Sequence, residues 1–380
     1  MIVALALSLL AGTQSDLVSQ ISSERLVATI ERLTSFNTRN TNSDGLTEAC
    51  EWAASELGKL PRMQVELMTY RATGRRMVEE KDVVQVVAVL PGRTDRRILV
   101  GGHIDSLDRA VDPVTGRAPG ADDDASGVAV AMELARVMSM RTWENTLVFV
   151  CFSGEEQGLL GSTALAARAK EEEWNLEAVF NNDIVGSSSN IAGYSNTREI
   201  RVFSDESTDH ESRELARFTE WTVRRELDDF RVKLVFRLDR FGRGGDHRSF
   251  NLQGFNGIRF CEVHEEFTRQ HTGQDKLEFI DPQYLRNAAR ANFVAMAALA
   301  DAKPAPARVR VNRRQGHDTR LQWQAQDGVE YVVYWRDSAS PVWQGTFEVG
   351  AVSEYTVFGI NKDDHTFAVG SVGGLPVVAR

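Results

Sequence analysis

Histidine and carboxylate side chains follow several apolar runs of the sequence, where a folded sheet would bring them together. The first pair, His103 and Asp105, comes directly after the apolar run at 98–102. Residues two apart in an extended segment lie on the same face, so the Asp105 carboxylate can reach one ring nitrogen of His103. Such a carboxylate orients a histidine toward a metal ion. The pair is equally consistent with a solvated strand end.

Three consecutive carboxylates, Asp122, Asp123 and Asp124, precede an expected helix. Adjacent negative charges repel one another, and a helix N-terminus relieves only part of that repulsion. An acidic N-terminal cap is therefore one interpretation. The two glycines and the small residues around the carboxylates favour the other, in which a strongly cationic group such as a pair of metal ions lies nearby.

Two adjacent glutamates, Glu155 and Glu156, directly follow the run at 146–152, whose continuous apolar composition is typical of a buried strand. One glutamate of such a pair can bind a metal ion while its neighbour, pointing elsewhere, serves as a base. An ordinary acidic pair at the start of a helix is the alternative.

The remaining candidates are Asp183, at the end of the strand-like run 177–183, and His271, in the polar loop 268–276. The sequence thus offers two histidines and three or four carboxylates at successive strand ends of one sheet. A mixed imidazole and carboxylate set suits Zn²⁺ better than Mg²⁺ or Ca²⁺, which take oxygen ligands. Because the set contains no cysteine, a structural zinc site of the thiolate type is excluded.

Five motifs now make a resemblance visible. In order along the chain they are GGHIDS, GADDDASGVA, SGEEQGLLGS, NND and HTGQD. In order and spacing they resemble the double-zinc aminopeptidases, a family of secreted bacterial leucyl-type enzymes whose wider relatives include glutamate carboxypeptidases and glutaminyl cyclases. The resemblance covers roughly residues 80–300. It implies a hydrolase that removes the N-terminal residue of a peptide with a free N-terminus.

The resemblance also implies a ligand set. The bridging aspartate of the family stands four residues before the glycine of the Ser-Gly pair in the second motif. In this chain that glycine is Gly127, so the bridging residue would be Asp123 and not Asp122. One zinc ion would take Asp123, Glu156 and His271. The second would take His103, Asp123 and Asp183, so that two Zn²⁺ ions share one carboxylate.

Other roles follow from the same resemblance. Glu155 would be the general base, Asp105 would support His103, and a cis peptide bond is expected between Asp123 and Asp124. Some members have a tyrosine before the last histidine, whereas Gln270 stands there in this chain.

Several alternatives stay open at this stage. A glutaminyl cyclase would work with one zinc ion, and the presence of His103 and Asp105 favours two. Related dipeptidases and carboxypeptidases carry a dimerisation insert for which 157–176 leaves no room. A non-catalytic peptide-binding protein on the same fold is opposed by the complete ligand set. In the segment GRGGDHRSF, Asp246 and His247 either support the metal ligands or face substrate, and the alternative for Asp246 is a helix N-cap.

Alternating strand and helix patterns must position these side chains. Strand-like runs occur at 64–70, 83–90, 97–103, 146–152, 177–183, 233–238 and 257–263, and helical patterns at 17–33, 49–60, 125–138, 158–170, 211–226 and 282–300. This alternation predicts an α/β three-layer sandwich with a mostly parallel central sheet. In such sheets ligands bind at the carboxyl ends of the strands.

The pattern changes after the linker at 303–307. From 308 to 380 only short alternating runs remain, which predict a small all-β sandwich. The runs TRLQWQ, YVVYWR and HTFAVGSV resemble strands of a fibronectin type III domain, with His365 where that fold usually has tyrosine. The expected organisation is therefore a zinc peptidase domain at 14–302 and a fibronectin type III-like domain at 308–380.

The composition of the chain limits the kinds of binding partner and the cellular compartment that we expect for the protein. The 380 residues carry a net charge of −10, which argues against a nucleic-acid binder. No apolar run reaches the ~18 residues that a membrane span needs. The apolar run from Ile2 to Gly12 suits a signal peptide at 1–13, although it lacks a basic start, and so predicts a secreted or periplasmic protein. We expect a monomer.

Overall fold

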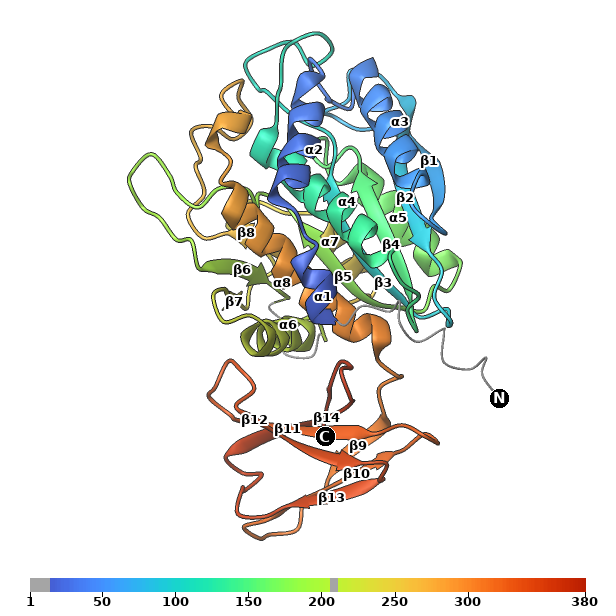
Figure 1. Cartoon of the computed structure of the whole chain (residues 1–380), viewed down its shortest axis with the longest axis vertical. Helices are drawn as coiled ribbons and strands as arrows, with labels where there is room; N and C mark the ends of the chain where they lie inside the picture. Colours follow the sequence, from blue (N-terminus) through green and yellow to red (C-terminus); the bar gives the residue numbers. More distant parts are fainter. Residues whose placement is uncertain (1–13, 206–210) are drawn as a thin grey trace, which may run out of the picture.

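The computed structural model describes residues 14–205 and 211–380, which form a larger α/β domain and a smaller C-terminal β domain (Figure 1). The expected signal peptide at 1–13 lies outside the described residues. The chain passes from the first domain to the second at the end of a long helix, α8 (Pro282–Asp301).

An eight-stranded sheet forms the centre of the α/β domain, in the order β1-β2-β4-β3-β5-β8-β6-β7. Its strands are β1 (Gln64–Ala72), β2 (Lys81–Leu90), β3 (Arg97–His103), β4 (Thr146–Phe152), β5 (Leu176–Asn182), β6 (Glu199–Phe203), β7 (Arg231–Val235) and β8 (Gly257–Glu262). The pairs β4–β3, β3–β5, β5–β8 and β6–β7 are parallel. The remaining neighbours are antiparallel, so the prediction of a mostly parallel sheet is confirmed.

Helices cover both faces of this sheet. They are α1 (Gln14–Ser19), α2 (Ser23–Ser35), α3 (Asp44–Gly58), α4 (Ser126–Met138), α5 (Leu160–Glu171), α6 (Ser212–Glu226), α7 (His247–Leu252) and α8. Alternate residues of a strand point to opposite faces. In β3, Ile98 and Val100 join the core beneath α2, α3, α4 and α8, whereas Leu99 joins the core beneath α5 and α7. The three-layer architecture follows from this two-sided burial.

Two local features differ from the sequence prediction. The helix expected at 17–33 is two helices, because Ser22 has extended backbone angles and its hydroxyl accepts a hydrogen bond from the Arg25 N–H, which starts α2 afresh. Strand β6 was not predicted. Its five residues alternate charged and apolar side chains over too short a length to stand out.

The C-terminal domain packs a three-stranded sheet, β13-β10-β9, against a four-stranded sheet, β12-β11-β14-β15. Its strands are β9 (Ala307–Val311), β10 (Thr319–Gln324), β11 (Tyr331–Asp337), β12 (Gly345–Gly350), β13 (Glu354–Val357), β14 (His365–Ser371) and β15 (Val377–Val378). Every strand pairing is antiparallel. Leu321, Tyr331 and Val333 are fully buried between the sheets, as an all-β sandwich requires.

The β domain rests against α6. The Trp221 ring of that helix packs edge-on against Tyr334, 6.0 Å between ring centroids. The Arg217 and Arg224 guanidinium groups donate to the main-chain carbonyls of Pro341 at 3.0 Å and Trp343 at 2.7 Å, respectively.

Among the described helices, none combines the length and the apolarity that crossing a lipid bilayer requires.

Candidate metal centre

The predicted ligands lie at the carboxyl edge of the parallel strands. Parallel strands end at a common edge, so residues that follow neighbouring strands meet there. His103 ends β3, Glu156 follows β4 and Asp183 follows β5. Asp123 lies in the turn η1 (Ala121–Ala125) before α4, where its backbone angles are not helical, and His271 lies in the loop between β8 and α8.

One group of three consists of His103, Asp123 and Asp183, whose potential ligand atoms all lie within 4.8 Å of one another. The His103 Nε2 atom is 3.1 Å from one Asp123 oxygen and 3.9 Å from an Asp183 oxygen. All three side chains are buried. The arrangement offers one imidazole nitrogen and two carboxylate oxygens to a single point.

A second group of three consists of Asp123, Glu156 and His271. The His271 Nε2 atom is 3.1 Å from the other Asp123 oxygen and 3.0 Å from Glu156 Oε1. The two oxygens of Asp123 therefore face one histidine each. Asp123 Oδ2 and Glu156 Oε1 are buried, and apart from the nearby His271 ring nitrogen they have no hydrogen-bond partner among the described residues. Buried carboxylate oxygens that share a single nitrogen neighbour fit a cation, and this ligand chemistry suits zinc.

The electrostatics of the protein groups agree with a cation site. Burial works to lower the pKa of His103, but its contacts with Asp105 and Asp123 raise it well above 6.5. Burial likewise opposes the charge of His271, and Asp123 and Glu156 nevertheless raise its pKa to about 9. The carboxylates around the two histidines therefore favour positive charge at this position.

Glu155 differs from its neighbour Glu156 in what it faces. Its carboxylate comes within 4.8 Å of ligand atoms of His103 and Glu156 but belongs to neither group that contains Asp123. Burial and the nearby carboxylates, first that of Glu156, raise the pKa of Glu155 well above 4.5, with His103 opposing. A carboxylate beside the ligands with such a raised pKa is suited to accepting a proton.

Asp105 supports the centre in a different way from the sequence expectation. Its main-chain carbonyl, not its carboxylate, makes the closer contact with His103 Nδ1, at 3.0 Å against 3.6 Å for the carboxylate oxygen. The carboxylate accepts hydrogen bonds from the main-chain N–H groups of Glu155 at 3.2 Å and Glu156 at 3.1 Å. Asp105 therefore fixes His103 and both glutamates at once.

The acidic turn around Asp123 is held by residues that the sequence did not single out for this task. The Asp275 carboxylate accepts from the Asp122 and Asp123 N–H groups, each at 2.9 Å. The fully buried guanidinium of Arg39 donates to the carbonyls of Pro119 and Gly120 at 2.6 and 2.8 Å. The peptide bond between Asp123 and Asp124 is cis.

Asp124 locks this turn onto the neighbouring strands. Its carboxylate accepts hydrogen bonds from the N–H groups of His103 at 2.9 Å, Gly127 at 2.9 Å and Ile184 at 3.2 Å. Only glycine fits at 127, because a Cβ there would lie 2.3 Å from the Asn182 carbonyl oxygen. The last aspartate of the acidic run is thus a structural residue between two ligand-bearing strands.

A buried arginine holds the far side of the centre. Arg259 of β8 is fully buried and lies 2.8 Å from the Asp183 carboxylate and 2.7 Å from that of Asp239. Asp239 lies in the loop after β7, so Arg259 joins this loop to the predicted ligand Asp183. The loop is further joined to the His271 loop, where Arg243 donates to Gln270 at 2.6 Å.

Asp246 and His247 both lie next to the centre and are fully buried. Asp246 occupies the N-cap position of α7 but makes no side-chain cap hydrogen bond, so the cap interpretation is wrong. Burial raises the pKa of Asp246 to about 7, against the opposing charge of His103. The His247 Nε2 atom is 2.8 Å from the Leu238 carbonyl, a contact that orients the loop rather than the substrate.

Comparison with known proteins decides the family. The family model described as "Peptidase family M28" matches residues 85–296, the segment that contains every predicted ligand. The chain belongs to peptidase family M28. A "Probable zinc metalloprotease" of Pyrenophora tritici-repentis is 33% identical over 94% of this chain and 94% of its own length. One of Pyricularia oryzae is 34% identical over 94% of this chain and 81% of its own.

Solved structures share the fold of this M28 peptidase. The Legionella pneumophila LapA aminopeptidase has a TM-score of 0.58 and 22% identity, covering 74% of this chain and 72% of its own. BSAP, a zinc aminopeptidase from Bacillus subtilis, has a TM-score of 0.57 at 16% identity, over 73% and 95%. A Fimbriiglobus ruber glutaminyl cyclase scores 0.57 at 16% identity, over 72% and 94%. These structures bear on the fold, whereas the family match and the relatives named zinc metalloproteases make the chain a zinc-dependent metallopeptidase, which confirms the predicted enzyme class.

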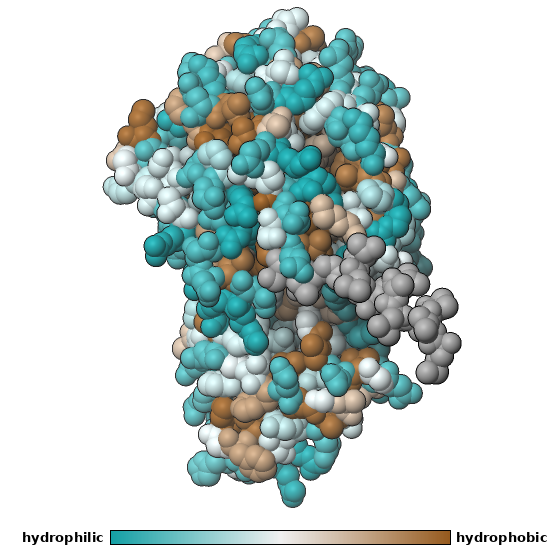
Figure 2. Space-filling model, in the orientation of Figure 1, coloured by the Kyte–Doolittle hydropathy of each residue, from teal (hydrophilic) through white to brown (hydrophobic). Residues whose placement is uncertain are grey.

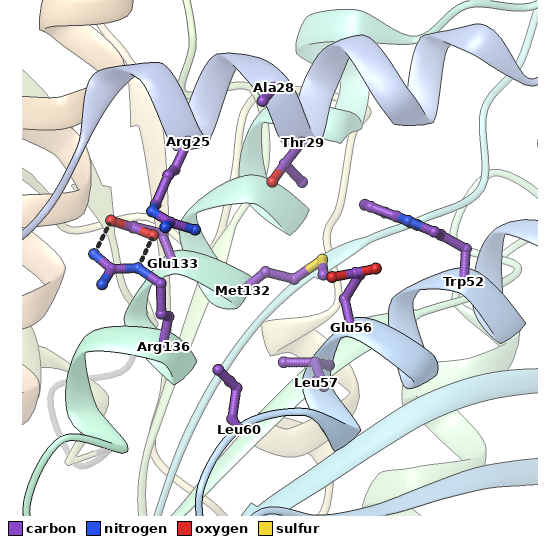
Figure 3. A pocket seen from close by; sticks show the side chains of 10 residues that line it. All are labelled: Arg25, Ala28, Thr29, Trp52, Glu56, Leu57, Leu60, Met132, Glu133 and Arg136. Atoms are coloured by element: carbon purple, nitrogen blue, oxygen red, sulfur yellow. Dashed lines mark hydrogen bonds and ion pairs between the residues drawn. The ribbon is translucent and has the colours of Figure 1, made fainter.

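A separate cavity of the M28 peptidase lies among its outer helices. It measures about 230 Å³ and lies between α2, α3 and α4 (Figure 3). Part of its charged wall is paired within the protein, because Glu133 accepts hydrogen bonds from the Arg136 guanidinium and from the Ser22 N–H. None of the predicted ligands lines it. The chemistry therefore belongs to the strand edge, not to this cavity.

Proposed function

We propose that this M28 peptidase is an aminopeptidase that binds two zinc ions. One ion would be held by Asp123, Glu156 and His271, and the other by His103, Asp123 and Asp183. The observation that carries the proposal is the position of Asp123, whose two oxygens each face a different histidine at 3.1 Å. A carboxylate shared in this way favours two metal sites over one.

The reaction would be hydrolysis of a peptide bond with Glu155 as the base. When bound, the zinc ions would acidify a water molecule and polarise the scissile carbonyl. The Glu155 carboxylate would accept the proton of that water and return it to the leaving amine. Asp105 holds the Glu155 main chain, so the base keeps its position through both transfers.

An excess of carboxylate around the centre supports recognition of a free N-terminus. Glu155 and Asp246 are not members of the two ligand groups, and both lie close enough to His103 for its charge to oppose the rise of their pKa values by burial. A substrate ammonium group placed among these carboxylates would gain favourable charge–charge interactions. That arrangement would restrict cleavage to the first peptide bond of the substrate.

Two loops at the carboxyl edge of the sheet, which follow β5 and β8, form a rim with exposed apolar side chains. Ile191 and Tyr194, on the loop after β5, are 75% and 63% exposed, and Phe267, on the loop before His271, is 65% exposed. Figure 2 shows apolar surface at the tip of the first loop. The Tyr194 ring stacks on His264 at 5.7 Å, which joins the two loops. We propose that apolar residues after the scissile bond bind here.

Glutaminyl cyclase activity is the second candidate. Its support is the shared fold of the Fimbriiglobus ruber glutaminyl cyclase, which at 16% identity bears on the fold alone. The two histidines facing one carboxylate favour the peptidase.

The test is hydrolysis of aminoacyl-anilides beside a parallel assay with a peptide that begins with glutamine. We expect release of the N-terminal residue, loss of that activity with a zinc chelator, and no turnover of an N-acetylated substrate. Cyclisation of the glutamine peptide without hydrolysis of anilides would establish the cyclase instead. Cleavage of the N-acetylated peptide would disprove recognition of the free amine.

Two further predictions concern regions outside the centre. We propose that the C-terminal domain is fibronectin type III-like, supported by its three-stranded and four-stranded sheets. We also propose that the protein is secreted or periplasmic, which the apolar run Ile2–Gly12 supports. Cell fractionation, with N-terminal sequencing of the exported protein, tests the second proposal.

A further inference from the structure

A large cavity lies between the two domains, at the end of the sheet opposite the metal centre. It measures about 910 Å³, within the size range of small-molecule sites. Its walls come from the starts of β3 and β5, from α6, from the linker, and from β9, β11 and β15 of the β domain. Because the predicted zinc ligands follow the other ends of β3 and β5, the cavity is separate from the catalytic centre (Figure 1).

The cavity is lined by many arginines. Six of its lining residues carry guanidinium groups, and they come from both domains: Arg96, Arg213, Arg217, Arg308, Arg336 and Arg380. Three glutamates, Glu177, Glu211 and Glu214, also line it. Six arginines against three glutamates leave an excess of positive charge among the lining side chains.

Neutralisation of these arginines is incomplete. Arg96 pairs with Glu177 at 2.6 Å, and Arg217 pairs with Glu214. Arg336 instead donates to neutral main-chain carbonyls, including that of Ser340 at 2.9 Å. Within the described part of the chain, no carboxylate lies within ion-pair distance of Arg336.

Two guanidinium nitrogens in the cavity also lack hydrogen-bond acceptors. The Arg96 side chain is more than nine-tenths buried, and its Nη1 atom has no hydrogen-bond partner in the described structure. The same holds for the buried Nε atom of Arg336. Burial and the charge of Arg217 lower the pKa of Arg336, against the opposing charges of Glu214 and Asp337. Buried donors without acceptors call for an explanation, and an anion supplies both acceptors and charge.

One buried hydrogen-bond acceptor in the cavity limits which kinds of anion can bind there. Glu214 Oε2 is buried and has no donor among the residues that the structure describes. A fully ionised anion would repel it, whereas an anion that also carries a hydroxyl group can donate to it. Hydrogen phosphate, hydrogen pyrophosphate and hydroxylated polycarboxylates have this combination of groups.

We propose that the interdomain cavity is a binding site for a small polyanion that carries closely spaced oxyanion groups and a hydroxyl. Arg96 and Arg217 of the α/β domain and Arg308 and Arg336 of the β domain would bind it. The planar guanidinium fork matches phosphate and carboxylate oxygens in pairs. Because the ligand would contact both domains, its binding would stabilise their docking.

The experiment is isothermal titration of the full chain, in its zinc-loaded form, with inorganic phosphate, pyrophosphate and citrate at constant ionic strength. We expect saturable binding of at least one of the three, and the ranking distinguishes phosphate-bearing from carboxylate-bearing ligands. The double variant Arg308→Gln/Arg336→Gln should weaken binding at least tenfold. Arg320→Gln is the matched control, because Arg320 lies on β10 and does not line the cavity. It should change the affinity less than twofold.

The possible outcomes separate this site from the catalytic one. Binding that persists unchanged in the double variant would place the anion elsewhere, the zinc ions included, and would overturn the proposal. No saturable binding of any of the three anions would also overturn it. Hydrolysis of aminoacyl-anilides by the double variant checks that its centre is intact. A variant that loses anion binding but keeps normal kcat supports a site independent of the peptidase activity.

Discussion

Replacing Glu155 with glutamine is the change that separates the proposed base from the proposed zinc ligands. The amide has the same size, and the Glu155 main-chain N–H would keep its hydrogen bond to Asp105. The raised pKa of Glu155 means that its negative charge is disfavoured in this buried surrounding of carboxylates. The neutral amide should therefore cost little stability, and Glu155→Gln should fold.

The expected effect is on rate, not on metal content. Glutamine cannot accept the proton of the attacking water, and general-base assistance is typically worth about 10²–10⁴ in rate. At about 1.4 kcal/mol per factor of ten, this corresponds to about 3–5 kcal/mol of lost transition-state stabilisation. KM should change little, because the base acts mainly in the transition state.

The assay is steady-state hydrolysis of an aminoacyl-anilide together with zinc analysis of the purified protein. Glu156→Gln is the control, and it should lose metal as well as rate, because Glu156 Oε1 faces His271 at 3.0 Å. Near-normal kcat of Glu155→Gln with full zinc would refute the base assignment. If Glu155→Gln loses zinc and Glu156→Gln retains it, the two roles have been exchanged.

Four other changes test the surroundings of the centre. Asp105→Asn should keep its zinc but lower kcat about 10–100-fold, because one amide oxygen must replace two carboxylate oxygens; unchanged kinetics would remove Asp105 from the account. The kcat/KM of the wild type should fall as the pH decreases, with a midpoint well above pH 4.5. The reason is that the raised pKa of Glu155 lets its carboxylate take up a proton in that range, and a protonated base is inactive. A flat profile down to pH 4.5 would contradict this. Arg259→Met should lose about 3–5 kcal/mol in urea unfolding because it removes the buried partner of Asp183 and Asp239, of which only Asp239 keeps another arginine, Arg240. A loss below 1 kcal/mol would argue against this. Phe267→Ser should raise KM for apolar tripeptides several-fold, whereas Leu252→Ser, exposed at the end of α7, should not; equal effects would remove the rim from substrate binding.

A truncated chain that ends at Lys303 tests whether the C-terminal domain is separable. All predicted ligands precede α8, so the shortened protein should keep its kcat. Its melting temperature should fall, because the Trp221 ring and the Arg224 guanidinium lose their partners in the β domain. A truncated protein that folds and binds zinc but shows no turnover would mean that the β domain completes the site.

The grouping of the ligands was predictable because it depends on a general property of parallel sheets. His103, Glu156 and Asp183 each come at or just after the end of an apolar run, and the three strands β3, β4 and β5 are neighbours in the sheet. Once these strands are parallel, their ends must meet. The structure accordingly places the predicted side chains together, while their individual roles stay predictions.

The residues that hold the ligands could not be found in the same way. Arg39, Asp275 and Arg259 are 81, 153 and 76 positions away from partners that they bind. No local spacing predicts a contact over such a separation, and a buried arginine looks like any other charge in the sequence. The early helix shows a similar limit, because the break at Ser22 depends on one capping hydrogen bond inside an otherwise continuous apolar pattern.

The central claim is that Asp123 joins two zinc ions in one active centre, and stepwise reconstitution tests it most directly. Zinc is removed with a chelator and then added back in measured equivalents, with hydrolysis of an aminoacyl-anilide and bound zinc recorded at each step. We predict that full activity requires two zinc ions per chain, and that Asp123→Asn weakens the binding of both. Full activity with one zinc ion per chain, or an Asp123→Asn variant that holds two ions as tightly as the wild type, would contradict the account.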